Sequence, residues 1–180
     1  SSPIDVYVSM EGSDESGDGS IYHPYATIKK AIENSLNDGI IYVDSGYYIE
    51  SDIIIEKRLA IYGNENVIID AQEKQLFNIT PKSSLSIVGI IIQNAHNVNG
   101  GSAFINNGKL SIINSTICNS SSYDDNSNPV FDHDMEFDEY GELERAKTIN
   151  CSEDGKGGAI LNNGELYINS SVFYNNLGQR

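Results

Sequence analysis

Four short segments of the sequence repeat one pattern: Leu59-Ala-Ile61-Tyr-Gly63, Leu85-Ser-Ile87-Val-Gly89, Leu110-Ser-Ile112-Ile-Asn114 and Leu166-Tyr-Ile168-Asn-Ser170. They begin 26, 25 and 56 residues apart. The alternation puts each Leu and Ile on one face of a short strand, which is too little apolar surface for a core. Because stacking the four segments makes a continuous apolar column, the sequence predicts an all-β solenoid with these eight residues inward.

The step of 56 residues contains one further repeat and an insertion. Residues 101–120 align with residues 157–176 at nine of twenty positions. A unit of about 25 residues with two or three short strands has the size of one coil of a parallel β-helix, each coil adding about 4.8 Å along the axis. Asn94, Asn119 and Asn175 share one position of the repeat, so we expect their stacked amides to form a hydrogen-bonded ladder.

The predicted repeat divides the chain into four parts. Residues 1–58 form an N-terminal cap and first coil, 59–119 form coils, 120–156 form an acidic insertion, and 157–180 form a further coil. Within the cap, residues 24–32 space their apolar side chains at helical intervals, with Thr27 as the N-cap. We expect the solenoid to continue beyond Arg180 and its open end to be covered by further repeats or by self-association.

The net charge limits the kinds of partner. The 180 residues carry 11 basic and 26 acidic side chains, a formal charge of −15. Such a chain repels nucleic acid and anionic membrane surfaces. Its apolar runs are also far shorter than the roughly 18 residues of a membrane-spanning helix, so no membrane insertion is expected.

Two parts of the sequence resemble known β-helix families. The order Tyr7-Val8, Gly12-Ser-Asp14, Gly17-Asp-Gly-Ser20 and Pro24-Tyr-Ala-Thr-Ile28 is similar to the amino-terminal cap of secreted proteins of the pectate-lyase-like superfamily. Gly157-Gly-Ala-Ile160 and Phe173-x-x-Asn176 resemble paired motifs of chlamydial polymorphic outer-membrane proteins and of adhesin-like surface proteins of methanogenic archaea. The resemblance implies a right-handed parallel β-helix located outside the cell or on its surface.

No catalytic residue is predicted. Enzymes of the pectate-lyase-like superfamily place carboxylates, with a basic residue or a histidine, on one strand face of neighbouring coils. Asp70 has no acidic counterpart one repeat later, where Gln93 and Asn94 lie, and we interpret it as a turn residue at a strand end. None of the arginines or histidines falls on the repeat's strand positions beside carboxylates on adjacent coils: Arg58, Arg145, Arg180, His23, His96 and His133.

The insertion is the most acidic part of the chain. Its eleven acidic and three basic residues contribute −8 of the net charge of −15. Asp132, Asp134, Glu136 and Asp138 alternate, so a strand here would put four carboxylates on one face. Oxygen-rich clusters of this kind suit calcium, which makes this row the candidate metal site. The alternative is a solvated loop with no metal, because the spacing matches no complete calcium-loop motif. The same two alternatives apply to Asp14, Glu15 and Asp18 in the cap.

Two cysteines, Cys118 and Cys151, flank the insertion. A disulfide between them would close a loop of about 33 residues and staple the insertion at its base. The alternative is a pair of free thiols. The repeat aligns Cys118 with Tyr174, next to the inward position of Ile117 and Phe173, so its thiol is expected to face outward.

Two functions remain open. The first is a non-enzymatic, adhesin-like module that binds a cell-surface glycan or a protein partner through its acidic loop or its flank. The second is the N-terminal part of a carbohydrate-active lyase or hydrolase whose catalytic coils lie outside residues 1–180. The β-helix itself does not separate them, because one fold hosts many functions.

Overall fold

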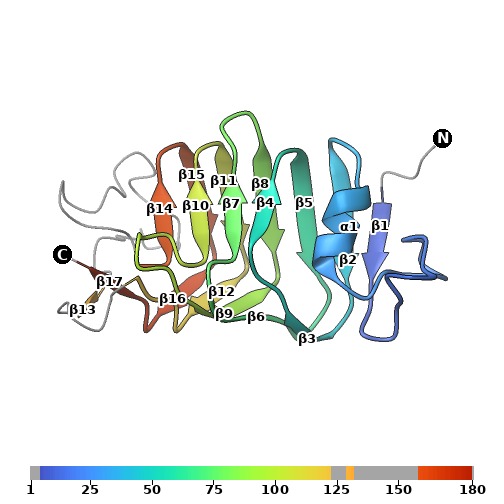
Figure 1. Ribbon diagram of the computed structural model, residues 1–180, viewed down its shortest axis with the longest axis horizontal. Coiled ribbons are helices and arrows are strands. Elements are labelled where there is room, and N and C mark those ends of the chain that lie inside the picture. Colours follow the sequence, from blue (N-terminus) through green and yellow to red (C-terminus); the bar gives the residue numbers. More distant parts are fainter. Residues whose placement is uncertain (1–4, 123–128, 132–157, 180) are drawn as a thin grey trace.

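The computed structural model describes residues 5–122, 129–131 and 158–179. The protein is mostly β, with three parallel sheets and one helix (Figure 1). Sheet A consists of β1 (Asp5–Val8), β2 (Gly39–Val43), β5 (Arg58–Gly63), β8 (Ser84–Val88), β11 (Lys109–Ile113) and β15 (Glu165–Asn169). Sheet B consists of β3 (Gly46–Ile49), β6 (Val67–Lys74), β9 (Ile91–Ala95), β12 (Thr116–Cys118) and β16 (Val172–Tyr174). Sheet C consists of β4 (Ile53–Ile55), β7 (Phe77–Ile79), β10 (Phe104–Asn106) and β14 (Ile160–Asn162).

The chain visits the three sheets in a fixed cycle. It runs from sheet A to sheet B to sheet C and then returns to sheet A, and we call each such pass a circuit. Within each sheet the strands of successive circuits are parallel neighbours, which Figure 1 shows as rows of strands with the same direction. A separate antiparallel pair joins β13 (Pro129–Phe131) to β17 (Leu177–Gln179). The inward side chains of all three sheets belong to one hydrophobic core.

The predicted apolar columns are confirmed in sheet A. Leu59, Leu85, Leu110 and Leu166 pair in register from strand to strand. The Ile column runs in the same way from Ile61 to Ile168, and all eight side chains are buried. The repeated positions in the sequence are therefore the positions that pair between neighbouring strands of sheet A.

Stacked asparagine amides occur at other residues than the predicted ones. Asn94, Asn119 and Asn175 share left-handed backbone conformations, with φ of 60°, 52° and 53°. The Asn94 amide, however, donates to Asp70 at 3.0 Å. Two stacked amide pairs lie at sheet C, where buried Asn106 donates to Asn162 Oδ1 at 2.7 Å and Asn163 donates to Asn107 Oδ1 at 3.1 Å. The repeat position of Asn94, Asn119 and Asn175 requires a positive φ, which Asn tolerates better than most residues.

Helix α1 (Ile28–Asn34) packs beside β1 and β2 at the N-terminal end of sheet A. Its predicted N-cap is confirmed, since Thr27 Oγ1 accepts from the backbone N–H of Lys30 at 3.1 Å. Two carboxylates hold the same helix end. Asp14 accepts from the N–H and the hydroxyl of Thr27, and buried Glu50 accepts from the N–H of Ile28 at 2.5 Å. Glu50, which directly follows β3 and lies 22 residues after Ile28, thus connects the start of α1 to the first circuit.

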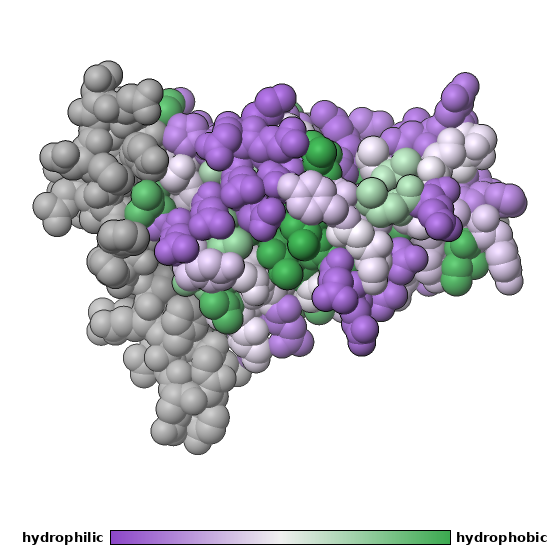
Figure 2. Space-filling view, turned by 90° about the horizontal axis from the view of Figure 1, so that it is seen from below, coloured by the Kyte–Doolittle hydropathy of each residue, from purple (hydrophilic) through white to green (hydrophobic). Residues whose placement is uncertain are grey.

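The outer face of sheet B is mixed in polarity. Figure 2, seen from below, shows hydrophilic side chains over much of this side and a hydrophobic cluster near its middle. Ile68 and Ile91 are paired and half-buried on the outer side of sheet B, next to exposed Tyr47 in the register.

Candidate functional site

Three tyrosines form a row across sheet A. Tyr7, Tyr42 and Tyr62 lie on β1, β2 and β5, which are adjacent strands, and they pair in register. Their neighbours along each strand, such as Ile41 and Val43, point into the core, so the tyrosines point outward. The ring centroids are 5.3 Å apart between Tyr7 and Tyr42 and 6.0 Å apart between Tyr42 and Tyr62. We call these three side chains the tyrosine row.

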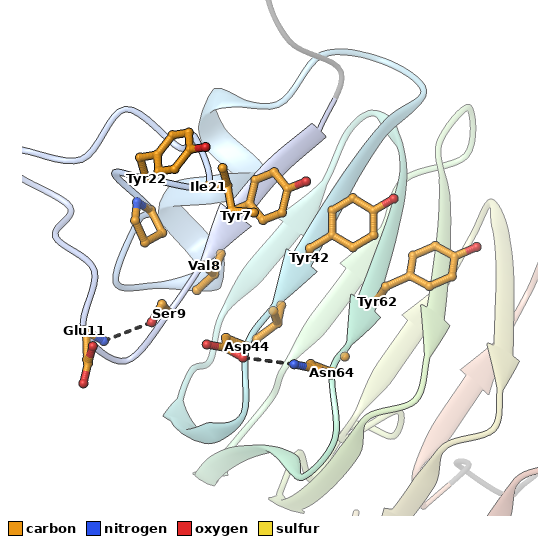
Figure 3. Close-up of a pocket in the computed structure, with 13 residues that line it drawn as sticks. Tyr7, Val8, Ser9, Glu11, Ile21, Tyr22, Tyr42, Asp44, Tyr62 and Asn64 are labelled. Atoms are coloured by element: carbon orange, nitrogen blue, oxygen red, sulfur yellow. Dashed lines mark hydrogen bonds between the residues drawn. The ribbon is translucent and has the colours of Figure 1, made fainter.

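The tyrosine row lies in a groove of about 740 Å³. Figure 3 shows the three rings side by side with their hydroxyl groups on the same side. The cap loop forms one end of the groove with Ile21, Tyr22 and Pro24. The ends of the strands contribute Asp44 and Asn64. The groove therefore combines an aromatic surface with polar groups along one edge.

Electrostatics give the groove an acidic, hydrogen-bonding edge. Glu11 and Asp44 line it, and Asp44 Oδ1 accepts from Asn64 Nδ2 at 3.1 Å. Burial raises the pKa of Tyr42, and the nearby Asp5 carboxylate adds to this rise. The Tyr42 hydroxyl is therefore protonated at neutral pH and is able to donate a hydrogen bond. None of the lining residues in the described part of the chain is Lys, Arg or His.

The candidate calcium ligands are not placed by the structure. Asp132, Asp134, Glu136 and Asp138 lie outside the described residues, so that site stays a prediction. Within residues 5–122, 129–131 and 158–179, no group of three or more potential metal-ligating side chains comes together. Asp14 instead anchors α1, as described above. Asp18 accepts from the N–H of Ser20 at 2.9 Å. Hydrogen bonds from the Ser20 side chain and from this N–H lower the pKa of Asp18.

Cys118 pairs in register with Tyr174, as the repeat predicts. The thiol is nevertheless only 1% exposed and lies against the Tyr174 hydroxyl, whose pKa it raises through a hydrogen bond. The outward position of Cys118 therefore does not leave its thiol accessible to solvent. Cys118 is a free thiol in the structure, and Cys151 lies outside the described residues, so the disulfide stays a prediction.

Asp70 is not a residue at a strand end. It lies within β6, at an irregularity in the pairing with β9, and it is buried. Its carboxylate accepts from the Tyr47 hydroxyl, from Asn94 Nδ2 and from the backbone N–H of Gln72. Burial by itself raises the pKa of Asp70, but these hydrogen bonds outweigh it and lower the pKa below its ordinary value. The carboxylate thus ties successive strands of sheet B together.

Sequence reasoning missed the tyrosine row. The first circuit is shorter than the others: Ile41 pairs with Ile61 after 20 residues, whereas Ile61 pairs with Ile87 after 26. A search at a period of 25 therefore does not align Tyr42 with Tyr62. The dipeptide Ile-Tyr occurs at 21–22, 41–42 and 61–62. Only the second and third copies lie in paired strands, so the dipeptide alone does not identify the row.

In the part of the chain that the structure describes, no helix has the length and apolarity needed to cross a membrane. The chain matches no protein-family model, and comparisons with curated proteins and with solved structures found no significant match.

Proposed function

We propose that the chain is a module of a right-handed parallel β-helix, displayed outside the cell, that binds a glycan in the tyrosine groove without chemical conversion. The cyclic path through three parallel sheets supports this fold. Connections between parallel strands of one sheet are nearly always right-handed, which supports the hand. The resemblance of the cap to secreted β-helix proteins supports the location.

The observation that carries the proposed function is the tyrosine row within its groove. Tyrosine presents a flat apolar ring and a polar hydroxyl. A sugar has the matching structure, since C–H groups cover the faces of its ring and hydroxyl groups surround its edge. The volume of about 740 Å³ lies in the range typical of small-molecule sites. Asp44, Asn64 and Glu11 supply acceptors and a donor for sugar hydroxyls at the edge.

The test is a glycan array probed with the full chain and with two single variants. Tyr62→Ala removes one ring of the tyrosine row, whereas Tyr167→Ala removes an outward tyrosine from β15, elsewhere in sheet A. The two side chains are comparably exposed, at 41% and 47%, so the variants are matched. We expect the array signal to fall in Tyr62→Ala and to persist in Tyr167→Ala. An array without signal, or equal signals from both variants, would contradict the proposal.

The same samples distinguish binding from catalysis. Hydrolysis of a glycosidic bond uses two carboxyl groups on either side of that bond. Glu11 and Asp44 both line the groove, so incubation with each bound glycan is followed by an assay for new reducing ends. We expect none, and their release by the full chain but not by Asp44→Asn would identify an enzyme instead.

A further inference from the structure

We infer that the ligand is a linear, uncharged glycan that lies across the strands of sheet A, with three successive sugar rings on Tyr7, Tyr42 and Tyr62. This inference rests on the proposed function and adds to it the direction, length and charge of the ligand. Each of the three properties comes from a different feature of the groove.

The direction and repeat of the ligand come from the tyrosine row. The row runs from strand to strand, perpendicular to the strands, and its ring centroids are separated by 5.3 and 6.0 Å. Neighbouring strands fix this spacing, because they lie about 4.8 Å apart. A hexopyranose ring with its glycosidic oxygen repeats at nearly the same distance along an extended polysaccharide. The spacing therefore matches one sugar per tyrosine without a change in register. Because the rings of Tyr7 and Tyr42 are stacked on each other, with 24° between their planes, each sugar lies against the outward part of a ring and its hydroxyl group.

An extended peptide fits the row less well. Its residues advance about 3.3 Å each, so side chains on one face recur at roughly twice that distance, beyond the ring spacing. Single-stranded nucleic acid also stacks on aromatic rows, but it needs basic groups for its phosphates. The described lining residues include two carboxylates and no cation. The glycan is thus the occupant that both spacing and charge favour.

The charge of the ligand comes from Glu11 and Asp44. A uronic acid or sulfated sugar would bring its anion next to these two exposed carboxylates, and like charges repel. Uncharged sugars avoid this repulsion and use the carboxylates as hydrogen-bond acceptors. The groove therefore selects against acidic polysaccharides.

The length of the ligand comes from the two ends of the row. At one end, Ile21 and Tyr22 of the cap loop lie beside Tyr7, as Figure 3 shows. At the other end, the residue in register after Tyr62 is Val88, which has no ring and does not line the groove. The row consequently offers stacking places for three sugars.

The test is isothermal titration of the full chain with neutral β-1,4-linked oligosaccharides of one to six units, in three series built from glucose, mannose and N-acetylglucosamine. Oligogalacturonides of the same lengths serve as the acidic probe. In at least one neutral series we expect affinity to rise up to three units and then change less than about twofold. Tyr62→Ala should weaken the trisaccharide about tenfold and leave the disaccharide nearly unchanged, while Tyr167→Ala should match the unmodified chain.

A further variant tests the charge selection. Asp44→Asn with Glu11→Gln should bind oligogalacturonides that the unmodified chain rejects. The inference is overturned if the array gives a ligand but affinity shows no step at three units, if acidic probes bind better, or if Tyr62→Ala behaves as Tyr167→Ala does in the titrations. Absence of any glycan ligand on the array instead overturns the proposed function. The two failures are therefore distinguishable.

Discussion

Glu50 shows how a single buried carboxyl group links the cap to the circuits. It is 6% exposed and accepts from the backbone N–H groups of Ile28 and Lys29 at the start of α1. Burial raises the pKa of Glu50 to about 7, against the opposing effect of these two hydrogen bonds. The negative charge of Asp14 raises it further. Compared with the unfolded chain, the folded protein therefore favours the protonated form of Glu50.

The raised pKa predicts that stability falls as the pH rises. Between the ordinary pKa of 4.5 and about 7, the folded state binds a proton at Glu50 that the unfolded state has released. This contribution is fully present below pH 4.5 and is lost as the pH rises through 7. Glu50→Gln imitates the protonated form, so its stability relative to the unmodified chain should rise by about 2–3 kcal/mol from pH 4.5 to pH 8. Urea denaturation at both pH values measures this difference.

The control for this measurement is Glu56→Gln, which neutralises an exposed glutamate near the end of β4. Its stability difference from the unmodified chain should stay nearly constant between the two pH values. A change with pH as large as that of Glu50→Gln would assign the effect to the overall negative charge. A constant difference for Glu50→Gln would show that folding does not raise the pKa of Glu50.

At the scale of a strand, the stacked columns of sheet A account for the stability of neighbouring circuits. Ile112 of β11 is fully buried between Ile87 and Ile168. Because truncation leaves a cavity that such a stack cannot easily close, Ile112→Ala should lower the free energy of unfolding by about 2–4 kcal/mol. Ile113→Ala, on the outward side of the same strand, should cost clearly less. Chemical denaturation of both variants tests this, and equal losses would contradict the inward placement of Ile112.

The sequence predicts the strands of sheet A where the same residues recur at a regular spacing. Leu85, Leu110 and Leu166 could be aligned because parallel neighbours in register carry the same side chain at the same position. The tyrosine row was not predicted, since the shorter first circuit changes the spacing of the repeat. Contacts that occur once, such as Glu50 with α1, leave no pattern in the sequence. They depend on how the cap folds back onto the first circuit.

At the scale of the whole molecule, the insertion interrupts the chain while the sheets continue. Strands before and after it are direct neighbours, as β10 is to β14 and β11 is to β15. Hydrogen bonds also span the gap of 56 residues: Ser102 Oγ donates to the carbonyl of Gly158 at 2.6 Å, and Asn176 Oδ1 accepts from the N–H of Ser120 at 3.0 Å. The antiparallel pair of β13 and β17 is outside the three parallel sheets. Among the described residues, the last circuit thus packs mainly on strands outside the insertion.

Removal of residues 123–150 should therefore leave the three parallel sheets folded. Amide hydrogen exchange checks this, because β11 and β15 should keep their protection, whereas exposure of β14 to β16 would show that the insertion is required.

The deletion also separates the two candidate sites, since Figure 1 places β1, β2 and β5 at the opposite end from β14 to β16. Glycan binding should persist in the shortened chain, and any calcium heat seen by calorimetry with the full chain should disappear. If the shortened chain keeps its exchange protection but no longer binds glycan, the binding site is in the insertion and not at the tyrosine row.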